Sequence, residues 1–229
     1  LGEMNSMFPK LNLGPSDVLS AWAGVRPLVA DQDEATPSVD VSREHRIEED
    51  RSGLYSMAGG KLTTHRVMAE ELVDRLEVVL RRTDGKPLLP CSTDTRPLRE
   101  DPFDAFELQT SLRRRYRLSP RTASRLVRSW GLDASTLLHD GGAVGLSKIG
   151  DSDYRLAELR WAAMHESPET LNDLLERRTR TAFFARASAF NDARRASHYV
   201  APFMGWSIEE ANNQARLYRE TIKRRFTVS

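Results

Sequence analysis

The spacing of hydrophobic and polar residues changes near residue 60. Before that point the two classes alternate with a period of two, which predicts strands over 18–29, 39–47 and 54–58. In the first strand Trp22, Gly24 and Arg26 share one face, and Pro27 restricts pairing there to a strand end or an edge. In the second, Arg43 falls on the apolar face, where a guanidinium needs a carboxylate or an anionic ligand as its partner.

Two glycines, Gly59 and Gly60, come directly before a run with helical spacing. The apolar positions of that run predict a helix over 61–82, which Gly85 and Pro87 end: Leu62, Met68, Ala69, Leu72, Val73, Leu76, Val79 and Leu80. The N–H groups and positive dipole end of such a helix can bind an anion, and Lys61 adds a charge there. A glycine turn before a helix is also ordinary, and the motif is no P-loop because Leu62 replaces the required Ser or Thr. Both interpretations stay open.

From residue 88 onward the pattern predicts a linker, over 88–100, and then only helices. We place a domain boundary near residue 95. Helices are predicted over 101–116, 119–131, 153–166, from 167, over 181–199 and from 207, with a short helical turn at 133–139 and a loop at 140–142. The predicted fold class is therefore α+β, with short strands and a helix over 1–95 and an all-α domain over 96–229.

The predicted helix starts carry recognisable caps. Asp101-Pro102, Ser119-Pro120 and Ser167-Pro168 each pair an N-cap residue with proline at the first helical position, and Ser207 with Glu210 forms a capping box. In the helix over 153–166, the positions expected to face inward are Leu156, Leu159, Ala163 and Met164.

The composition is that of a soluble globular protein. A net charge of +1, from 34 Lys and Arg against 33 Asp and Glu, gives no overall basic field of the kind typical of nucleic-acid binders. The single cysteine, Cys91, excludes an intramolecular disulfide. No run approaches the roughly 20 apolar residues of a spanning helix, and no leader is expected. The five histidines lack metal-ligand spacing, so we expect no metal.

Three basic runs, at 113–117, 177–180 and 223–225, have two interpretations. They can contact phosphate or an anionic membrane, but each lies near a helix end or junction, where cations suit the dipole, and we favour the structural role. The segment 119–131 with its neighbours can also form a helix-turn-helix. The alternative function is therefore a non-catalytic helical module that binds a protein or nucleic-acid partner.

The order of three motifs is similar to that of a known family. Ala23-Gly24-Val25-Arg26-Pro27 is followed by Ser42-Arg43 and then by Gly59-Gly60-Lys61-Leu62-Thr63-Thr64-His65-Arg66. This order resembles the FAD-dependent, quinone-linked glycerol-3-phosphate dehydrogenases, with His65 where relatives commonly have tyrosine. The runs Leu112-Arg113-Arg114-Arg115-Tyr116 and Glu176-Arg177-Arg178-Thr179 agree with the C-terminal domain of that family.

One motif of that family is not found in the chain. Nothing here fits its G-x-G-x-x-G dinucleotide motif. The resemblance therefore implies that 1–95 is the C-terminal part of the FAD-binding and substrate domain and that 96–229 is an all-α C-terminal cap domain. The chain also begins with Leu1 and not with Met, which favours the interpretation that it is a trimmed fragment.

The resemblance also implies roles for individual residues. Arg26 would be catalytic and substrate-binding, steadying charge on the substrate oxygen, while Arg43 and Lys61 would help to hold the substrate phosphate. The residues implied to contact the pyrimidine edge of FAD are Gly59, Gly60, Lys61, Leu62, Thr63 and Thr64. The general base is not identified.

The implied reaction is oxidation of sn-glycerol 3-phosphate to dihydroxyacetone phosphate, with electrons passing from FAD to quinone. The expected partners are glycerol 3-phosphate and quinone, without nucleic acid, and the chain alone is expected to be inactive. A homodimer, and a cytoplasmic location with peripheral contact at the inner face of the membrane, are further hypotheses.

Overall fold

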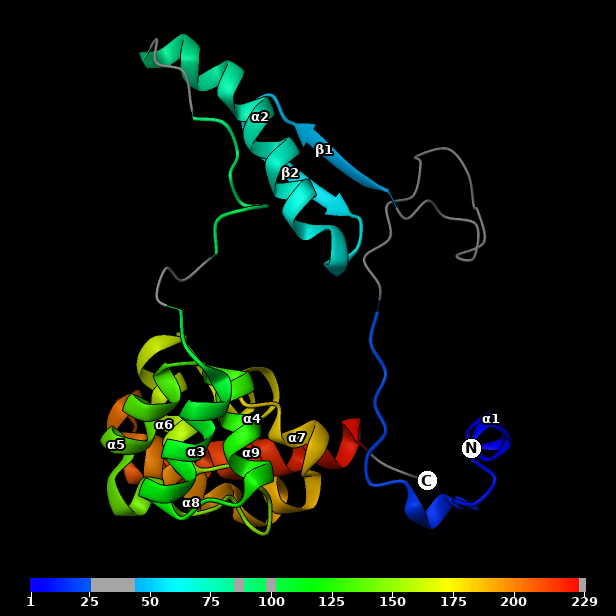
Figure 1. Cartoon of the computed structure of the whole chain (residues 1–229), viewed down its shortest axis with the longest axis vertical. Coiled ribbons are helices and arrows are strands. Elements are labelled where there is room, and N and C mark those ends of the chain that lie inside the picture. Colours follow the sequence, from blue (N-terminus) through cyan, green and yellow to red (C-terminus); the bar gives the residue numbers. More distant parts are fainter. Residues whose placement is uncertain (26–43, 85–88, 98–101, 227–229) are drawn as a thin grey trace. The chain divides into compact units, whose positions relative to one another are not determined.

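A computed structural model describes residues 1–25, 44–84, 89–97 and 102–226. The chain forms two compact units, Gly24–Pro102 and Leu1–Ala23 together with Phe103–Ser229. The described strands are confined to the first unit, and the second contains a large set of helices (Figure 1). The α+β fold class with a C-terminal helical domain is confirmed, while the exact domain boundary near residue 95 stays a prediction.

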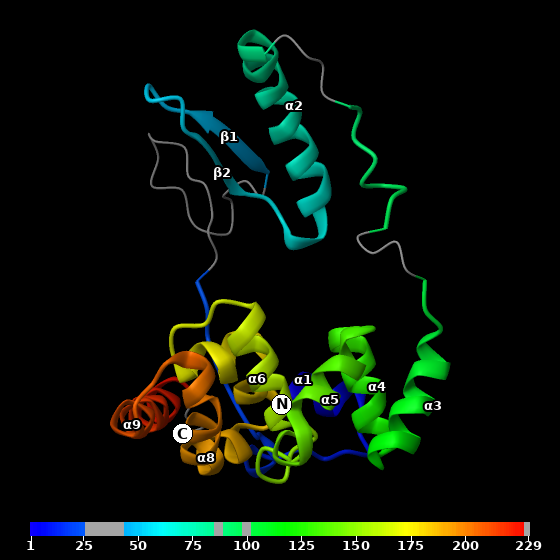
Figure 2. The ribbon, with the colours of Figure 1, turned by 90° about the vertical axis from the view of Figure 1, so that its left-hand side faces the viewer.

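The unit Gly24–Pro102 contains a β-hairpin and one long helix. Strands β1 (His45–Glu49) and β2 (Tyr55–Gly59) pair antiparallel, with His45 opposite Gly59 and Glu49 opposite Tyr55. Helix α2 (His65–Asp84) lies along the hairpin in both ribbon views (Figures 1 and 2). The predicted third strand and the predicted helix from residue 61 are thereby confirmed.

Asp50 closes the hairpin turn. Its carboxylate accepts hydrogen bonds from the Ser52 hydroxyl at 2.6 Å, from the Ser52 N–H at 2.7 Å and from the Leu54 N–H at 3.0 Å. These bonds, first that of the Ser52 side chain, lower the pKa of Asp50 because they favour the ionised form. A short polar segment therefore holds the register that places His45 and Ile47 on the less exposed face, as the alternation predicts.

The strand predicted over 18–29 is wrong in its described part. Residues 18–25 pair with no other strand within the described ranges. The Trp22 ring instead packs edge-on against Phe183, with centroids 4.9 Å apart, and lies 6.5 Å from the ring of Phe226. An alternating pattern without a partner strand does not form a ladder, and aromatic packing takes its place. Positions 26–29, and 39–43 of the second predicted strand, lie outside the described residues.

The second unit is built from helices. In chain order its described elements are α1 (Gly2–Met7), the 3₁₀ turn η1 (Pro15–Asp17), α3 (Ala105–Tyr116), α4 (Pro120–Trp130), α5 (Asp133–Gly145), α6 (Leu156–His165), the π-helix η3 (Asp173–Arg178), α7 (Thr181–Phe184), α8 (Arg186–Met204) and α9 (Ile208–Arg225). Helix α6 contacts both α5 and α8 and lies between them (Figure 2).

Two buried clusters form the core of this unit. One joins α3, α4 and α5 through Leu112, Leu126, Leu137 and Leu138, among others. The other joins α6, η3, α8 and α9, and its largest side chains include Leu159, Leu174, Tyr218 and Phe226. Leu156 and Leu159 are fully buried, as predicted, whereas Met164 is 50% exposed, so its predicted inward position is wrong. It lies two residues after Ala162, the last buried position of the helix, and therefore on the opposite face.

Two predicted helix starts are wrong because another residue supplies the cap. Helix α3 begins after Asp104, not Asp101, since the Asp104 carboxylate accepts from the N–H groups of Phe106 and Glu107. No helix begins at Ser167, whose φ is +47°. Helical structure resumes at residue 171. Ser119 and Ser207 cap α4 and α9 as predicted.

The loop predicted at 140–142 is also wrong, because α5 continues to Gly145 across a kink at Gly142. A Cβ on Gly141 would lie 2.5 Å from the Cβ of Ala157, so the glycine allows α5 and α6 to approach each other closely. The helix predicted over 181–199 is divided at Ala185 into α7 and α8.

Thr170 and Asp173 cap the start of the segment that includes η3. The Asp173 carboxylate accepts the N–H groups of Thr170 at 2.9 Å and Glu169 at 3.1 Å, and the Thr170 hydroxyl accepts the Asp173 N–H at 3.2 Å. Burial alone would raise the pKa of Asp173, but these hydrogen bonds and the Arg177 charge outweigh it and lower the pKa.

We expect Asp173→Asn to lower the free energy of unfolding by about 1 kcal/mol at pH 7. Because the folded-state pKa of Asp173 is depressed, its contribution is present above the unfolded pKa of about 3.9 and is lost as the pH falls through the folded value. Urea denaturation of both proteins at neutral pH and below the unfolded pKa measures this. The prediction is contradicted if the difference in unfolding free energy persists at low pH. It is also contradicted if Asp151→Asn, at an exposed position, lowers the stability by the same amount.

Candidate functional site

The glycine turn after β2 holds its shape through its backbone. Gly59 and Gly60 have φ values of +78° and +72°, a region that side chains rarely adopt. A Cβ on Gly60 would lie 2.6 Å from the Met68 sulfur and 3.2 Å from the His45 Cβ. Gly60 therefore brings the start of the helical segment close to the hairpin.

Lys61 to Thr64 form the turn that starts the helical segment. Lys61 is extended, and the 3₁₀ turn η2 (Leu62–Thr64) passes directly into α2. The Thr64 hydroxyl lies 3.3 Å from the Lys61 nitrogen and donates to the Lys61 carbonyl at 3.0 Å. This hydroxyl is therefore engaged within the turn. Helical geometry leaves the N–H groups of Leu62 and Thr63 without an intrahelical acceptor, at the positive end of the dipole.

An open groove of about 540 Å³ runs beside this turn, within the hairpin and α2 unit. Its lining consists of Glu44, His45, Ile47, Gly60, Lys61, Thr64, Val67, Met68, Glu71 and Arg75. His45 Nε2 lies 2.7 Å from a Glu71 carboxylate oxygen. Arg75 donates to the Ile47 carbonyl at 3.2 Å. Lys61 is exposed and has no ion pair with any described residue, so its charge faces the groove unpaired.

The groove brings together only some of the residues singled out in the sequence. Gly60, Lys61 and Thr64 line it, and Gly59 adjoins them. Leu62 is 88% exposed, and neither it nor Thr63 lines the groove. Arg26 and Arg43 lie outside the described residues. The ligand roles of all these residues stay predictions.

Sequence reasoning missed the acidic and basic side chains of α2 that line the groove. Glu71 and Arg75 are four residues apart, so they share one face of the helix with Met68 and Thr64. That spacing was a usable signal. The pairing of Glu71 with His45 depends on the packing of the helix on the hairpin, which the spacing does not specify.

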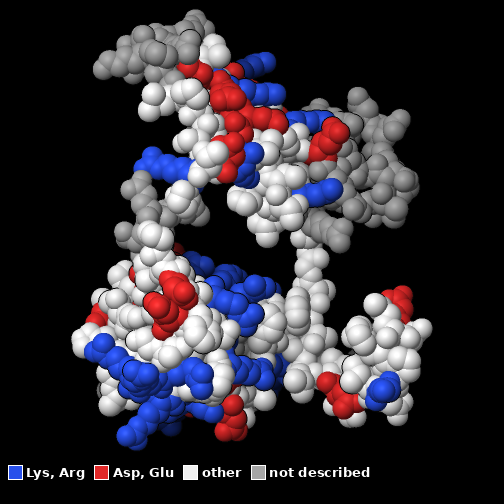
Figure 3. Space-filling view, viewed as in Figure 1, with Lys and Arg blue, Asp and Glu red and all other residues white. Residues whose placement is uncertain are grey.

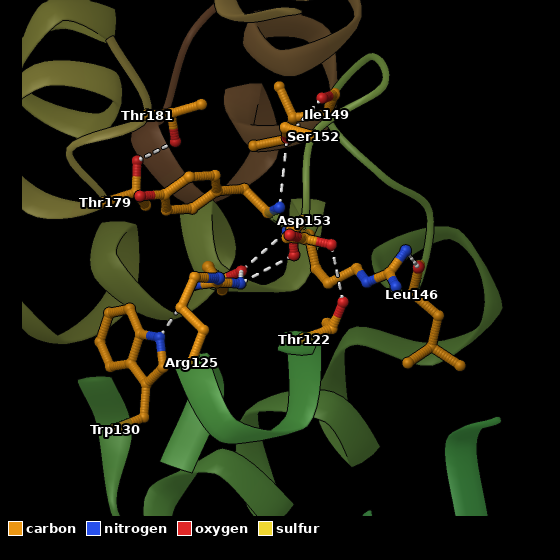
Figure 4. A network of polar contacts seen from close by, with 12 residues as sticks. Thr122, Arg125, Trp130, Leu146, Ile149, Ser152, Asp153, Thr179 and Thr181 are labelled. Atoms are coloured by element: carbon orange, nitrogen blue, oxygen red, sulfur yellow. Dashed lines mark hydrogen bonds and ion pairs between the residues drawn. The ribbon is translucent and has the colours of Figure 1, made fainter. Parts of the chain in front are cut away.

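A buried polar network in the helical unit is a second feature that the sequence did not reveal (Figure 4). Glu158, which is 1% exposed, accepts two hydrogen bonds from the Arg125 guanidinium, at 2.6 and 2.7 Å. It also accepts from the Trp130 indole N–H at 3.0 Å and from the Arg155 backbone N–H at 2.8 Å. The buried carboxylate is thus fully engaged by donors from α4 and from the start of α6.

Neighbouring groups extend this network. Arg125 also donates to the Asp153 carbonyl at 2.9 Å, and its guanidinium lies 4.2 Å from the centre of the Tyr154 ring. The Thr122 hydroxyl donates to the Asp153 carboxylate at 3.0 Å (Figure 4). Burial alone would lower the pKa of Arg125, but the hydrogen bonds and charge of Glu158 raise it above its usual value.

The structural role favoured for the basic runs is confirmed at several positions. Arg177 pairs with Asp173 at 2.7 Å, Arg178 donates to the Glu166 carbonyl at 2.9 Å, and Arg225 pairs with the buried Glu176 at 2.8 Å. Residues 113–115 are exposed in the last turn of α3. Figure 3 shows Lys and Arg side chains gathered on the visible face of the helical unit.

Neither a metal site nor a membrane-spanning helix is found within the described ranges. No three His, Cys, Asp or Glu side chains come together there as metal ligands. None of the helices described has both the length and the apolar character needed to cross a bilayer.

The hairpin with its helix and the helical unit together define an α+β protein with a C-terminal helical domain. Residues 91–211 match the family described as the C-terminal domain of alpha-glycerophosphate oxidase. The chain belongs to this family.

Curated relatives include the aerobic glycerol-3-phosphate dehydrogenases of Staphylococcus aureus strains USA300, NCTC 8325 / PS 47 and COL, each 32% identical over 191 residues. The aligned region covers 79% of this chain and 33% of each relative, so the chain spans about a third of their length. The resemblance noted from the motif order is confirmed. By name, these homologues are oxidoreductases that act on glycerol 3-phosphate.

Proposed function

We propose that this chain is the C-terminal part of an FAD-dependent sn-glycerol-3-phosphate dehydrogenase. The complete protein would oxidise glycerol 3-phosphate to dihydroxyacetone phosphate and pass the electrons to quinone, in the cytoplasm at the inner face of the membrane. The observation that carries the proposal is the family match over 91–211, together with relatives named for this activity. The groove beside the glycine turn supplies the residues that would contact the ligands.

The residues of the turn fit the flavin edge implied by the family. Gly60 has a positive φ, and a side chain at this position would clash with Met68. The N–H groups of Leu62 and Thr63 stand at the start of a helical segment, where negative charge is favoured. When bound, the flavin supplies the hydride acceptor. The groups of this chain would stabilise charge at the flavin edge.

Lys61 is the candidate phosphate contact among the described residues. Its ammonium has no carboxylate partner there and lines the groove beside the helix start. A point charge on a flexible stem suits a phosphate that must enter and leave. By family resemblance, Arg43 would add a bidentate contact and Arg26 would stabilise the developing carbonyl.

Exposed apolar side chains on α2 further support membership in a larger domain. No described residue in the hairpin and α2 unit is buried, and Val67, Val73 and Val78 are all exposed. Apolar side chains at helical spacing are normally covered by packing. We infer that other parts of the full-length protein cover these side chains of α2.

The test uses the full-length protein. We expect it to be yellow and to reduce an artificial electron acceptor when glycerol 3-phosphate is added. Arg26→Ala should lower turnover by at least about tenfold, because a charge stabilising the transition state is lost, with little change in the unfolding midpoint. Arg113→Ala, at an exposed position in α3, is the control and should leave turnover unchanged. A colourless full-length protein that is indifferent to this substrate would refute the proposal.

A further inference from the structure

The helical unit contains an open cavity of about 950 Å³. It lies between α4, the loop at 151–154 and the segment 178–188, all within the same unit. This volume lies at the upper end of the range of about 300–1,000 Å³ that small-molecule sites occupy. Its lining includes the side chains of Arg121, Arg125, Arg128, Tyr154, Arg178 and Arg180.

Five arginines and four carboxylates line the cavity, but their pairing is uneven. Three of the arginines have a carboxylate partner: Arg121 with Asp153 at 2.8 Å, Arg125 with Glu158 at 2.6 Å and Arg178 with Glu166 at 3.6 Å. The side chains of Arg128 and Arg180 are exposed and make neither an ion pair nor a hydrogen bond within the described part of the chain. The fourth carboxylate, Asp151, is exposed and pairs with neither.

The exposed Arg180 side chain contacts two aromatic rings in a way that leaves its N–H groups available. Its backbone has φ +62° and ψ +18°, an uncommon conformation for a residue other than glycine. The guanidinium lies 5.9 Å from the Phe183 ring centre and 5.7 Å from that of Phe184, which lines the cavity. Stacking on rings uses the charge and the flat face of a guanidinium, so the donors along its edge stay free.

Tyr154 supplies a neutral donor beside these charges. The residue is 9% exposed and lines the cavity, yet its hydroxyl has no hydrogen-bond partner among the residues described. Burial raises the pKa of Tyr154, and the charge of Arg125, whose guanidinium lies 4.2 Å from the ring centre, opposes that rise. Because Tyr154 lines the cavity and its hydroxyl has no partner among the described residues, this hydroxyl is free to donate to an acceptor atom of a ligand.

We propose that this cavity binds the phosphate group of a small molecule through Arg128, Arg180 and Tyr154. Two guanidinium groups match the double negative charge of a phosphate and its planar pairs of oxygens, and the phenol donates to a further oxygen. The three paired arginines are neutralised by their carboxylates. The remaining volume accommodates the organic part of a phosphate monoester.

The test follows the Trp130 indole N–H by ¹H–¹⁵N NMR in the complete 229-residue chain. Trp130 lines the cavity and donates to Glu158, so its resonance reports on this site and not on the groove beside Lys61. Trp130→Phe assigns the signal. Inorganic phosphate and glycerol 3-phosphate are titrated separately at constant ionic strength, with sodium chloride as the third arm. We expect saturable shifts with both phosphates, tighter with the monoester.

The double variant Arg128→Gln/Arg180→Gln should weaken phosphate binding at least about tenfold, and Tyr154→Phe should weaken it less. The matched control Arg113→Gln/Arg114→Gln removes the same charge from exposed positions outside the cavity and should leave the affinity unchanged. Equal shifts with chloride, equal weakening in the control, or no saturation below about 10 mM phosphate would overturn the proposal. The dehydrogenase proposal is independent of this outcome, because the readout is binding in the helical unit.

Discussion

Glu158→Ala is expected to lower the free energy of unfolding of the helical unit by about 3–5 kcal/mol. The side chain is 1% exposed and accepts hydrogen bonds from Arg125, Trp130 and the Arg155 backbone. Removing the carboxylate leaves a half-buried guanidinium without its counter-charge and leaves two further donors unpaired. The cost therefore comes mainly from the groups that lose their acceptor.

Urea denaturation followed by far-UV circular dichroism measures this effect. Glu220→Ala is the matched control, because Glu220 also pairs with an arginine, Arg216, at 2.8 Å, but at a site where both side chains are more than half exposed. Its loss should cost no more than about 0.5 kcal/mol. Adding Arg125→Met to Glu158→Ala should cost much less than Arg125→Met alone, because the interaction is already absent. Additive effects, or equal losses at the two sites, would show that the network is not stabilising in the way described.

Gly150→Ala is the second substitution from which we expect a large loss, of roughly 2–4 kcal/mol. Gly150 has a φ of +54°, and a Cβ there would lie 2.9 Å from the Cα of Ser188 and 2.8 Å from its Cβ. The clash is with backbone of α8, which cannot move aside as a flexible side chain can. The Gly150 N–H also donates to the Asp192 carboxylate at 2.9 Å, and this docks the loop on α8.

Gly205→Ala separates the two causes of this loss. Gly205 has a similar φ of +67°, but no atom would lie within 4 Å of an added Cβ. This variant should show only the cost of the backbone conformation, about 1 kcal/mol. Thermal or urea unfolding of both variants gives the difference, which measures the contact with Ser188. Equal losses would mean that the backbone conformation alone explains the effect and that the loop can move away from α8.

Local patterns predicted those elements whose ends depend on neighbouring residues. Ser119 and Ser207 cap their helices because an N-cap bond joins a side chain to an N–H three residues later. The same reasoning predicted Asp101 as the N-cap of α3, whereas Asp104 forms that cap. Several residues near one helix start have suitable side chains, and the packing of Leu112 and its neighbours selects among them.

Errors arose where a distant contact overrides a local preference. Gly141 lies within α5 although consecutive glycines favour a loop. Glycine is needed at this helical position because Ala157 of α6 leaves no room for a larger side chain. Trp22 packs on Phe183 in place of a partner strand. The candidate site was predicted in the same partial way: the turn from Gly59 to Thr64 was identified from spacing, whereas the His45 and Glu71 pair beside it was not.

The sequence by itself determined the strand and the glycine turn before α2, the caps of α4 and α9, the helical character of the C-terminal unit and the motif order by which the family was identified. These features depend on residues a few positions apart, where backbone geometry fixes what each side chain can reach. The tertiary structure alone decided which charges meet. Arg125 and Glu158, which form an ion pair, are 33 residues apart, and Arg128 and Arg180, which line the same cavity, are farther apart still. Ion pairs depend on distance in space, and that distance exists only once α4, α6 and the segment after η3 have packed together.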